Sequence, residues 1–191
     1  HDMARRLAAV GYFVVLPNLY YRASRDFYLA ERTEAAMARM FALMDSLGAT
    51  TTACDTTALL RFVDAQAQAD ANRIGAVGYC MSGPFVMWAA AANPGRFRSI
   101  ASIHGAQMAT DAPDSPHRMA PKIMCECYFA CAEIDKWAPP ADIEKLQAAL
   151  QAAGTPYRIE WYPGVEHGFV FPKRGTIYNQ AAAERHWERL F

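Results

Sequence analysis

The segment Val77–Gly83 (VGYCMSG) constrains the fold of this chain more than any other, because it joins two different kinds of element. The apolar run Ile74–Tyr79 is typical of a buried strand, and a helix rich in small residues follows from Pro84 to Ala92. A turn this tight needs glycine two residues before the cysteine and three after it. We therefore predict a strained strand–turn–helix that lifts Cys80 above a sheet.

This position would suit Cys80 to covalent chemistry. At the positive end of a helix, the dipole and the backbone N–H groups favour both a thiolate and a developing oxyanion. The arrangement is that of a nucleophile elbow, with sulfur in place of the usual serine oxygen. We expect the backbone N–H of Met81 to be one oxyanion donor, a contact worth about 3 kcal/mol in comparable sites.

Charge and composition exclude several kinds of partner. Nineteen basic residues balance nineteen acidic ones without any basic run, so we expect no nucleic acid and no anionic membrane as partners. No apolar run approaches the roughly 20 residues that span a bilayer. We expect a small molecule as the partner, and a monomer or homodimer as the state of the protein.

The cysteines indicate a reducing, cytoplasmic location, because five is an odd number and no disulfide-dense scaffold surrounds them. Cys125 and Cys127 alternate along an apolar strand, and Cys131 is expected beyond its end. No matching pair or histidine set accompanies them, so we expect packed thiols, no metal and no cofactor.

Strand and helix patterns alternate along the chain, which predicts an α/β fold: a mostly parallel sheet with helices on both faces, in a single domain over residues 1–191. The expected strands are Tyr12–Leu16, Ile74–Tyr79, Ser99–Ile103, Lys122–Phe129 and Arg158–Trp161, and the expected helices are Met3–Val10, about Leu29–Leu47, about Thr52–Ala69, Pro84–Ala92, Pro140–Ala153 and Ile177–Phe191.

A thiol nucleophile needs a base, and the base needs a carboxylate that orients it. In such a sheet, catalytic residues follow the carboxyl ends of strands. His167 lies six residues past the last expected strand, between flexible glycines, and Asp135 follows the strand before it. The order Cys80, Asp135, His167 is that of the α/β-hydrolase fold.

Other residues compete for these roles. His104 ends the strand after the elbow, where it would be the base in a class I glutamine amidotransferase-like enzyme; otherwise we expect it to be partly buried and satisfied by backbone groups. His117 and His186 are expected to be solvated. Asp111 and Asp114 are alternative acids, whereas Asp142 fits the first turn of a helix.

Taken together, these residues resemble the dienelactone hydrolase family, the cysteine members of the α/β-hydrolase fold. The resemblance covers nearly the whole chain, and its most specific parts are Gly78–Gly83 and Tyr162–Phe169; further support comes from the segments Arg6–Tyr12 and Leu16–Arg22 and the loop of Asp135. It implies that Cys80 is the nucleophile, Asp135 the acid and His167 the base. It also implies that Arg22 binds a substrate carboxylate.

Three departures from the family pattern qualify this picture. Ser82 stands where the family usually has glycine, and Phe171 stands where a second carboxylate-binding arginine is usual, which indicates a more apolar site. The family also has about three more strands at the start. We therefore expect an N-terminally incomplete chain, or another polypeptide in the gap, and weak activity if these residues are the whole protein.

The sequence thus predicts hydrolysis of a small ester or lactone through a thioester on Cys80. Tyr20, Tyr21, Trp137, Phe169 and Phe171 are expected to wall an acyl pocket or to belong to the core. The alternative from another class of function is a non-catalytic thiol sensor or binding module.

Overall fold

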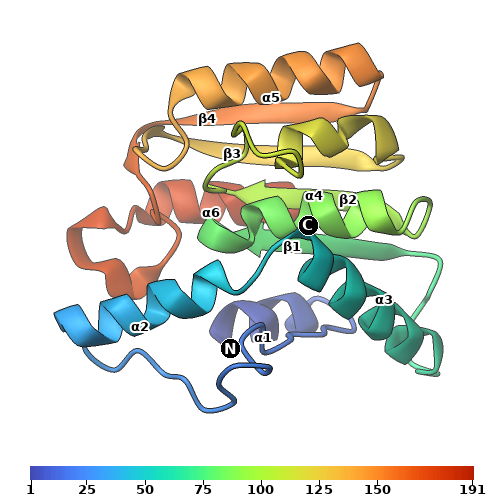
Figure 1. Ribbon diagram of the computed structural model, residues 1–191, viewed down its shortest axis with the longest axis horizontal. Coiled ribbons are helices and arrows are strands. Elements are labelled where there is room, and N and C mark those ends of the chain that lie inside the picture. Colours follow the sequence, from blue (N-terminus) through green and yellow to red (C-terminus); the bar gives the residue numbers. More distant parts are fainter. The chain divides into compact units, whose positions relative to one another are not determined.

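The structure is a computed structural model that describes all residues, 1–191 (Figure 1). Its internal contacts divide the chain into two compact units, His1–Ala71 and Asn72–Phe191. None of its helices has both the length and the apolar character needed to cross a bilayer.

The first unit is helical and contains α1 (Asp2–Ala9), α2 (Glu34–Asp45) and α3 (Ala49–Asp64). Thr33 caps α2 by accepting a hydrogen bond from the backbone N–H of Ala36. The prediction of a strand at Tyr12–Leu16 is wrong in this structure, which has no strand between residues 1 and 71. A strand exists only where a neighbour completes its hydrogen-bond ladder, and no segment of this unit does so.

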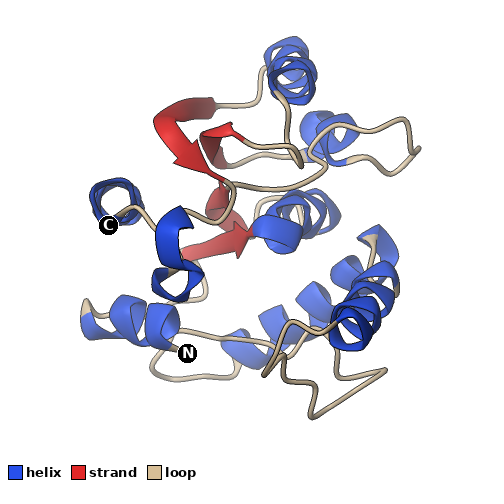
Figure 2. Ribbon diagram, turned by 90° about the vertical axis from the view of Figure 1, so that its left-hand side faces the viewer, coloured by secondary structure: helices blue, strands red, loops and turns tan.

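The second unit is built on four parallel strands in the order β1 (Ile74–Tyr79), β2 (Phe97–Ile103), β3 (Glu126–Ile134) and β4 (Tyr157–Glu166). Because each strand is placed beside the previous one in the same direction, right-handed crossovers bring all the connections to one face. These connections are α4 (Gly83–Ala92), the 3₁₀ helix η2 (Pro116–Lys122) and α5 (Pro140–Ala153). The last helix, α6 (Gln180–Leu190), lies on the opposite face (Figure 2). The predicted two-faced α/β arrangement is confirmed.

The strand register brings four loops to one edge of the sheet. Tyr79 pairs with Ile103, so Cys80 and His104 follow neighbouring strand ends. Ile134 pairs with Glu166, so Asp135 and His167 also follow neighbouring ends. Since the strands are parallel, all four residues emerge at the same carboxyl edge.

The third predicted strand is displaced. Residues 122–125 precede β3, because η2 extends to Lys122 and the strand begins only at Glu126. Cys131 therefore lies inside the strand and not beyond its end, and Cys125 lies just before it. Both are buried, as is Cys127.

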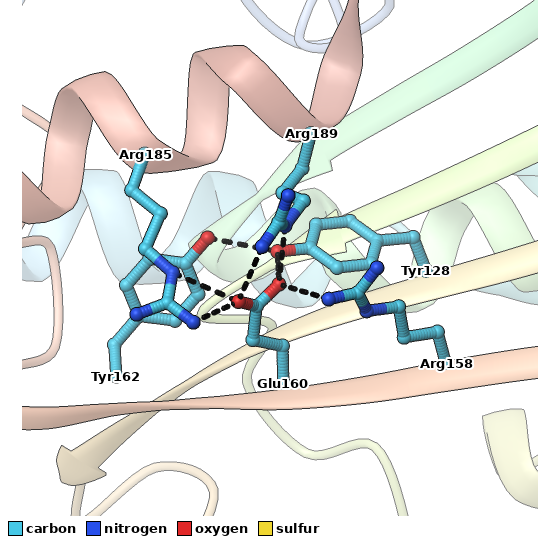
Figure 3. A network of polar contacts seen from close by, with 6 residues as sticks. All are labelled: Tyr128, Arg158, Glu160, Tyr162, Arg185 and Arg189. Carbon is cyan, nitrogen blue, oxygen red and sulfur yellow. Dashed lines mark hydrogen bonds and ion pairs between the residues drawn. The ribbon is translucent and has the colours of Figure 1, made fainter.

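A polar network holds α6 to the sheet around Glu160 of β4 (Figure 3). Glu160 is 7% exposed and accepts hydrogen bonds from Arg185, from Arg189 and from the hydroxyl of Tyr128. Arg158 forms a further ion pair with it at 3.6 Å. Each carboxylate oxygen thus has more than one donor, which explains how this charge is tolerated in a buried position.

Candidate active site

The turn that carries Cys80 has the predicted strained geometry. Cys80 has a φ of +54°, in the left-handed region that residues with side chains seldom adopt. A Cβ at Gly78 would lie 2.0 Å from the backbone oxygen of Ser82, and one at Gly83 would lie 2.3 Å from the Cα of Gly105. Both glycines are therefore required by close backbone approach, as the sequence predicts.

Ser82 strengthens this turn. Its hydroxyl accepts a hydrogen bond from the N–H of Tyr79 at 2.8 Å and donates one to the carbonyl of the same residue at 2.9 Å. Ser82, which stands where the family usually has glycine, therefore restrains the backbone of the turn through its side-chain hydrogen bonds.

Asp135 and His167 form the central polar contact of the site. Nδ1 of His167 donates to Oδ2 of Asp135 at 2.7 Å, and Oδ1 of Asp135 accepts from the N–H of Trp137 at 2.8 Å. The two side chains are 10% and 1% exposed. A buried carboxylate held in this way fixes the tautomer of the imidazole, so that Nε2 is the nitrogen able to exchange a proton.

Cys80 is half-buried, and its side chain interacts with the imidazole of His167. Burial lowers the pKa of His167, but hydrogen bonding to Asp135 and to Cys80, together with the attraction of their charges, outweighs it and raises the pKa to about 9. The imidazole is therefore stabilised in its protonated form between sulfur and carboxylate. Such an arrangement can hold a thiolate–imidazolium pair.

His104 differs from what its sequence position predicts. It is 1% exposed, not partly buried, and no other side chain hydrogen-bonds to its ring. Burial, followed by the charge of His167, holds its pKa well below the usual value, so the ring is neutral. The carboxylate partner belongs to His167 and not to His104, because the longer β3 places Asp135 beside the end of β4.

The prediction of a solvated His186 is wrong, because α6 turns this residue toward the sheet, where it is fully buried. Its Nδ1 donates to the carbonyl of Ala183, and its Nε2 contacts the hydroxyl of Tyr79 at 3.4 Å. His117 is partly buried and hydrogen-bonded to Ser115 at 2.8 Å. Both histidines are thus satisfied away from the thiol.

Aromatic rings surround the histidines. His104 meets His167 at a centroid distance of 4.9 Å, Phe171 at 5.2 Å and Phe169 at 5.6 Å, each time edge to face. Phe169 is fully buried and packs in the core, whereas Phe171 is partly exposed. Their roles in substrate binding stay predictions.

The two remaining predicted substrate-binding residues lie in the first unit. Arg22 pairs with Asp55 through both terminal nitrogens, at 2.6 and 2.5 Å, and Tyr21 also donates to Asp55. Tyr20 packs edge to face on Phe27 at 5.8 Å. The ion pair of Arg22 was not anticipated from the sequence, since its partner lies 33 residues further along the chain.

The chain is similar to known proteins over nearly its whole length. A protein of Synechocystis sp. named "Putative carboxymethylenebutenolidase" is 27% identical over 99% of this chain and 76% of its own length. A carboxymethylenebutenolidase of Rhodococcus opacus is 26% identical, over 98% of this chain and 71% of its own. The solved "Putative Dienelactone Hydrolase" of Klebsiella pneumoniae shares the fold, with a TM-score of 0.84 at 23% identity over 99% of this chain and 77% of its own.

The profile of the dienelactone hydrolase family matches residues 1–191, the full length of the sequence. This match argues against the alternative prediction of a class I glutamine amidotransferase-like enzyme with His104 as its base. The fold is the α/β-hydrolase fold, and the chain belongs to the dienelactone hydrolase family.

Proposed function

We propose that the protein hydrolyses a small ester or lactone by covalent catalysis, with Cys80 as nucleophile, His167 as acid and base, and Asp135 as the residue that orients His167. The observation that supports this most strongly is the 2.7 Å hydrogen bond between Asp135 and the ring of His167, a ring that also interacts with Cys80. The three residues follow three different strands, so their meeting is a property of the fold.

In the first half of the reaction, the sulfur of Cys80 attacks the carbonyl carbon. The backbone N–H of Met81, the residue after the nucleophile, stabilises the oxyanion at the start of the helical turn Cys80–Ser82. His167 gives its proton to the leaving oxygen, which departs as an alcohol or enol. A thioester on Cys80 remains.

In the second half, water attacks the thioester carbon and gives a proton to Nε2 of His167. The C–S bond breaks, its electron pair returns to the sulfur, and the acid product leaves. Activated esters and enol-lactones suit a thiolate because their leaving oxygen is stable, whereas amides need stronger acid assistance. The Phe171 side chain, in place of a family arginine, favours acyl groups with an apolar surface.

The test is turnover of p-nitrophenyl acetate by the purified protein and two cysteine variants. Cys80→Ala should lose all measurable turnover while its circular dichroism spectrum stays unchanged. Cys54→Ala removes an exposed thiol of the first unit and serves as the matched control, with unchanged turnover expected. Full activity in Cys80→Ala would contradict the proposed mechanism.

A further inference from the structure

His186 is a buried histidine that the proposed mechanism does not use. It shares the buried face of α6 with Ala183 and Trp187, and it is fully enclosed. An apolar side chain would fill this position without the free-energy cost of burying two ring nitrogens. The hydrogen bonds of His186 therefore indicate a role beyond packing.

The contacts of His186 define which ring nitrogen accepts. Nδ1 faces the carbonyl of Ala183, three residues earlier in α6, and a carbonyl can only accept, so Nδ1 carries the proton. In the neutral ring Nε2 is then the acceptor, and it faces the hydroxyl of Tyr79 at 3.4 Å. Burial raises the pKa of Tyr79, so the hydroxyl keeps the proton that it donates. The two rings also meet edge to face, with their centroids 6.0 Å apart.

Tyr79 directly precedes the nucleophile, and both its backbone and its ring contact the site. Its N–H and its carbonyl are bridged by the hydroxyl of Ser82, at 2.8 and 2.9 Å. Its ring packs against that of His104 at a centroid distance of 6.1 Å, and the ring of His104 meets that of His167 at 4.9 Å. A displacement of the Tyr79 ring would therefore reach both the turn that carries Cys80 and the rings beside the base.

We propose that His186 is a positioning residue for the hydrolysis: by accepting the hydrogen bond of Tyr79, it holds the ring that supports the turn of Cys80 and the ring of His104. This inference rests on the proposed function. Attack and proton transfer need the sulfur of Cys80 and the imidazole of His167 in a precise alignment, and a small displacement lowers the rate steeply. The loss of this contact should therefore lower kcat and leave KM nearly unchanged.

A double-mutant cycle tests this role. Tyr79→Phe removes the hydroxyl and His186→Phe removes the acceptor, and each should lower kcat for p-nitrophenyl acetate about tenfold with KM within about twofold of the original. The double variant should be no worse than either single one, because both changes break the same hydrogen bond. Tyr79→Phe removes a single atom, so it serves if His186→Phe does not fold.

Two further variants separate positioning from a general loosening of α6. His186→Gln brings an amide oxygen near the place of Nε2, so its kcat should return to within about threefold of the original. Glu160→Gln weakens the contacts of Arg185 and Arg189 on the same helix and leaves the contact with Tyr79 in place, so its kcat should be unchanged.

The proposal is overturned if the two phenylalanine variants keep their kcat, if their losses add in the double variant, or if KM rises while kcat stays the same. It is also overturned if His186→Gln is no better than His186→Phe, or if Glu160→Gln lowers kcat as much. Failure of the proposed function would look different, because Cys80→Ala would then still hydrolyse the ester.

Discussion

Two polar clusters of the second unit follow opposite principles. Around Glu160, a buried carboxylate is saturated by two arginines and a tyrosine hydroxyl (Figure 3). Around Cys80, His104 and His167, the buried side chains have fewer hydrogen-bond partners, and two of these three residues have positive φ. The first cluster joins α6 to β4, and the second gathers the loops at the carboxyl edge of the sheet.

The difference shows which cluster is organised for stability. Each buried polar atom without a partner costs about 1–3 kcal/mol, and a residue held in a sparsely populated backbone conformation costs a similar amount. Such free-energy costs are retained where a catalytic site needs polar groups that are free to interact with the substrate. We therefore expect substitutions near Glu160 to change the free energy of unfolding without changing catalysis, and substitutions near His167 to have their largest effect on catalysis.

The largest effect is expected from the His167–Asp135 pair. His167→Ala removes the proposed acid and base, and Asp135→Asn removes the carboxylate that fixes the tautomer, so kcat should fall about 10³- to 10⁴-fold in either variant. The double variant should be little worse than the single ones, because the residues act as a unit. The measurement is kcat with p-nitrophenyl acetate. Additive losses in the double variant would contradict the view that His167 and Asp135 act as a unit.

Glu160→Gln should have the next largest effect, on stability and not on chemistry. The variant leaves Arg185 and Arg189 without a charged partner and should lower the free energy of unfolding by about 3 kcal/mol. Urea denaturation measures this, with kcat of the folded protein unchanged. Glu188→Gln on the exposed side of α6 is the control, with an expected change below about 0.5 kcal/mol. Equal effects in both variants would contradict the account.

The two clusters should also act at opposite ends of the pH scale. Burial raises the pKa of Glu160, but the hydrogen bonds from Arg189 and Arg185 prevail and lower it from 4.5 to about 2. Its stabilisation is therefore complete above pH 4.5 and is lost as the pH falls toward 2. The pKa of His167 is raised from 6.5 to about 9, so its stabilisation is complete below pH 6.5 and is lost as the pH rises through 9.

Urea denaturation between pH 3 and pH 10 would separate these contributions. Glu160→Gln should flatten only the acid side of the stability curve, and His167→Ala only the alkaline side, each by a few kcal/mol. An alkaline side that is the same in His167→Ala as in the original protein would show that its imidazole is not stabilised in the charged form.

The smallest effect is expected from Ser82→Ala. It removes one hydroxyl that bridges the N–H and carbonyl of Tyr79, and should cost about 1 kcal/mol of stability with less than a tenfold loss in kcat. Ser46→Ala, which removes a hydroxyl bonded to the carbonyl of Leu43 in the other unit, is a control for stability alone. Loss of kcat in both variants would contradict a local role for Ser82.

Much of the second unit could be predicted from the sequence, because its signals are local. The apolar run before Cys80 matches β1 residue for residue, and the proline and glycine around residues 140–154 mark α5 correctly. Gly78 and Gly83 also reveal the close approach at the elbow. Where backbone sterics or helix-end signals determine the structure, the local sequence is enough to predict it.

What could not be predicted depends on tertiary partners. Tyr12–Leu16 has a strand composition but no neighbouring strand, and His186 has a helical position that does not reveal which face is buried. The sequence also predicts only partial burial for His104. Its full burial is visible only when His167 and the aromatic rings are in place.

The central claim is that Cys80 carries the acyl group between the two halves of the reaction. Acid quenching of the protein during turnover of p-nitrophenyl acetate, followed by peptide mapping by mass spectrometry, tests it most directly. The account predicts an acetyl thioester on the peptide that contains Cys80 and on no other cysteine peptide. Hydrolysis with an acetyl group elsewhere, or with none on Cys80, would contradict it.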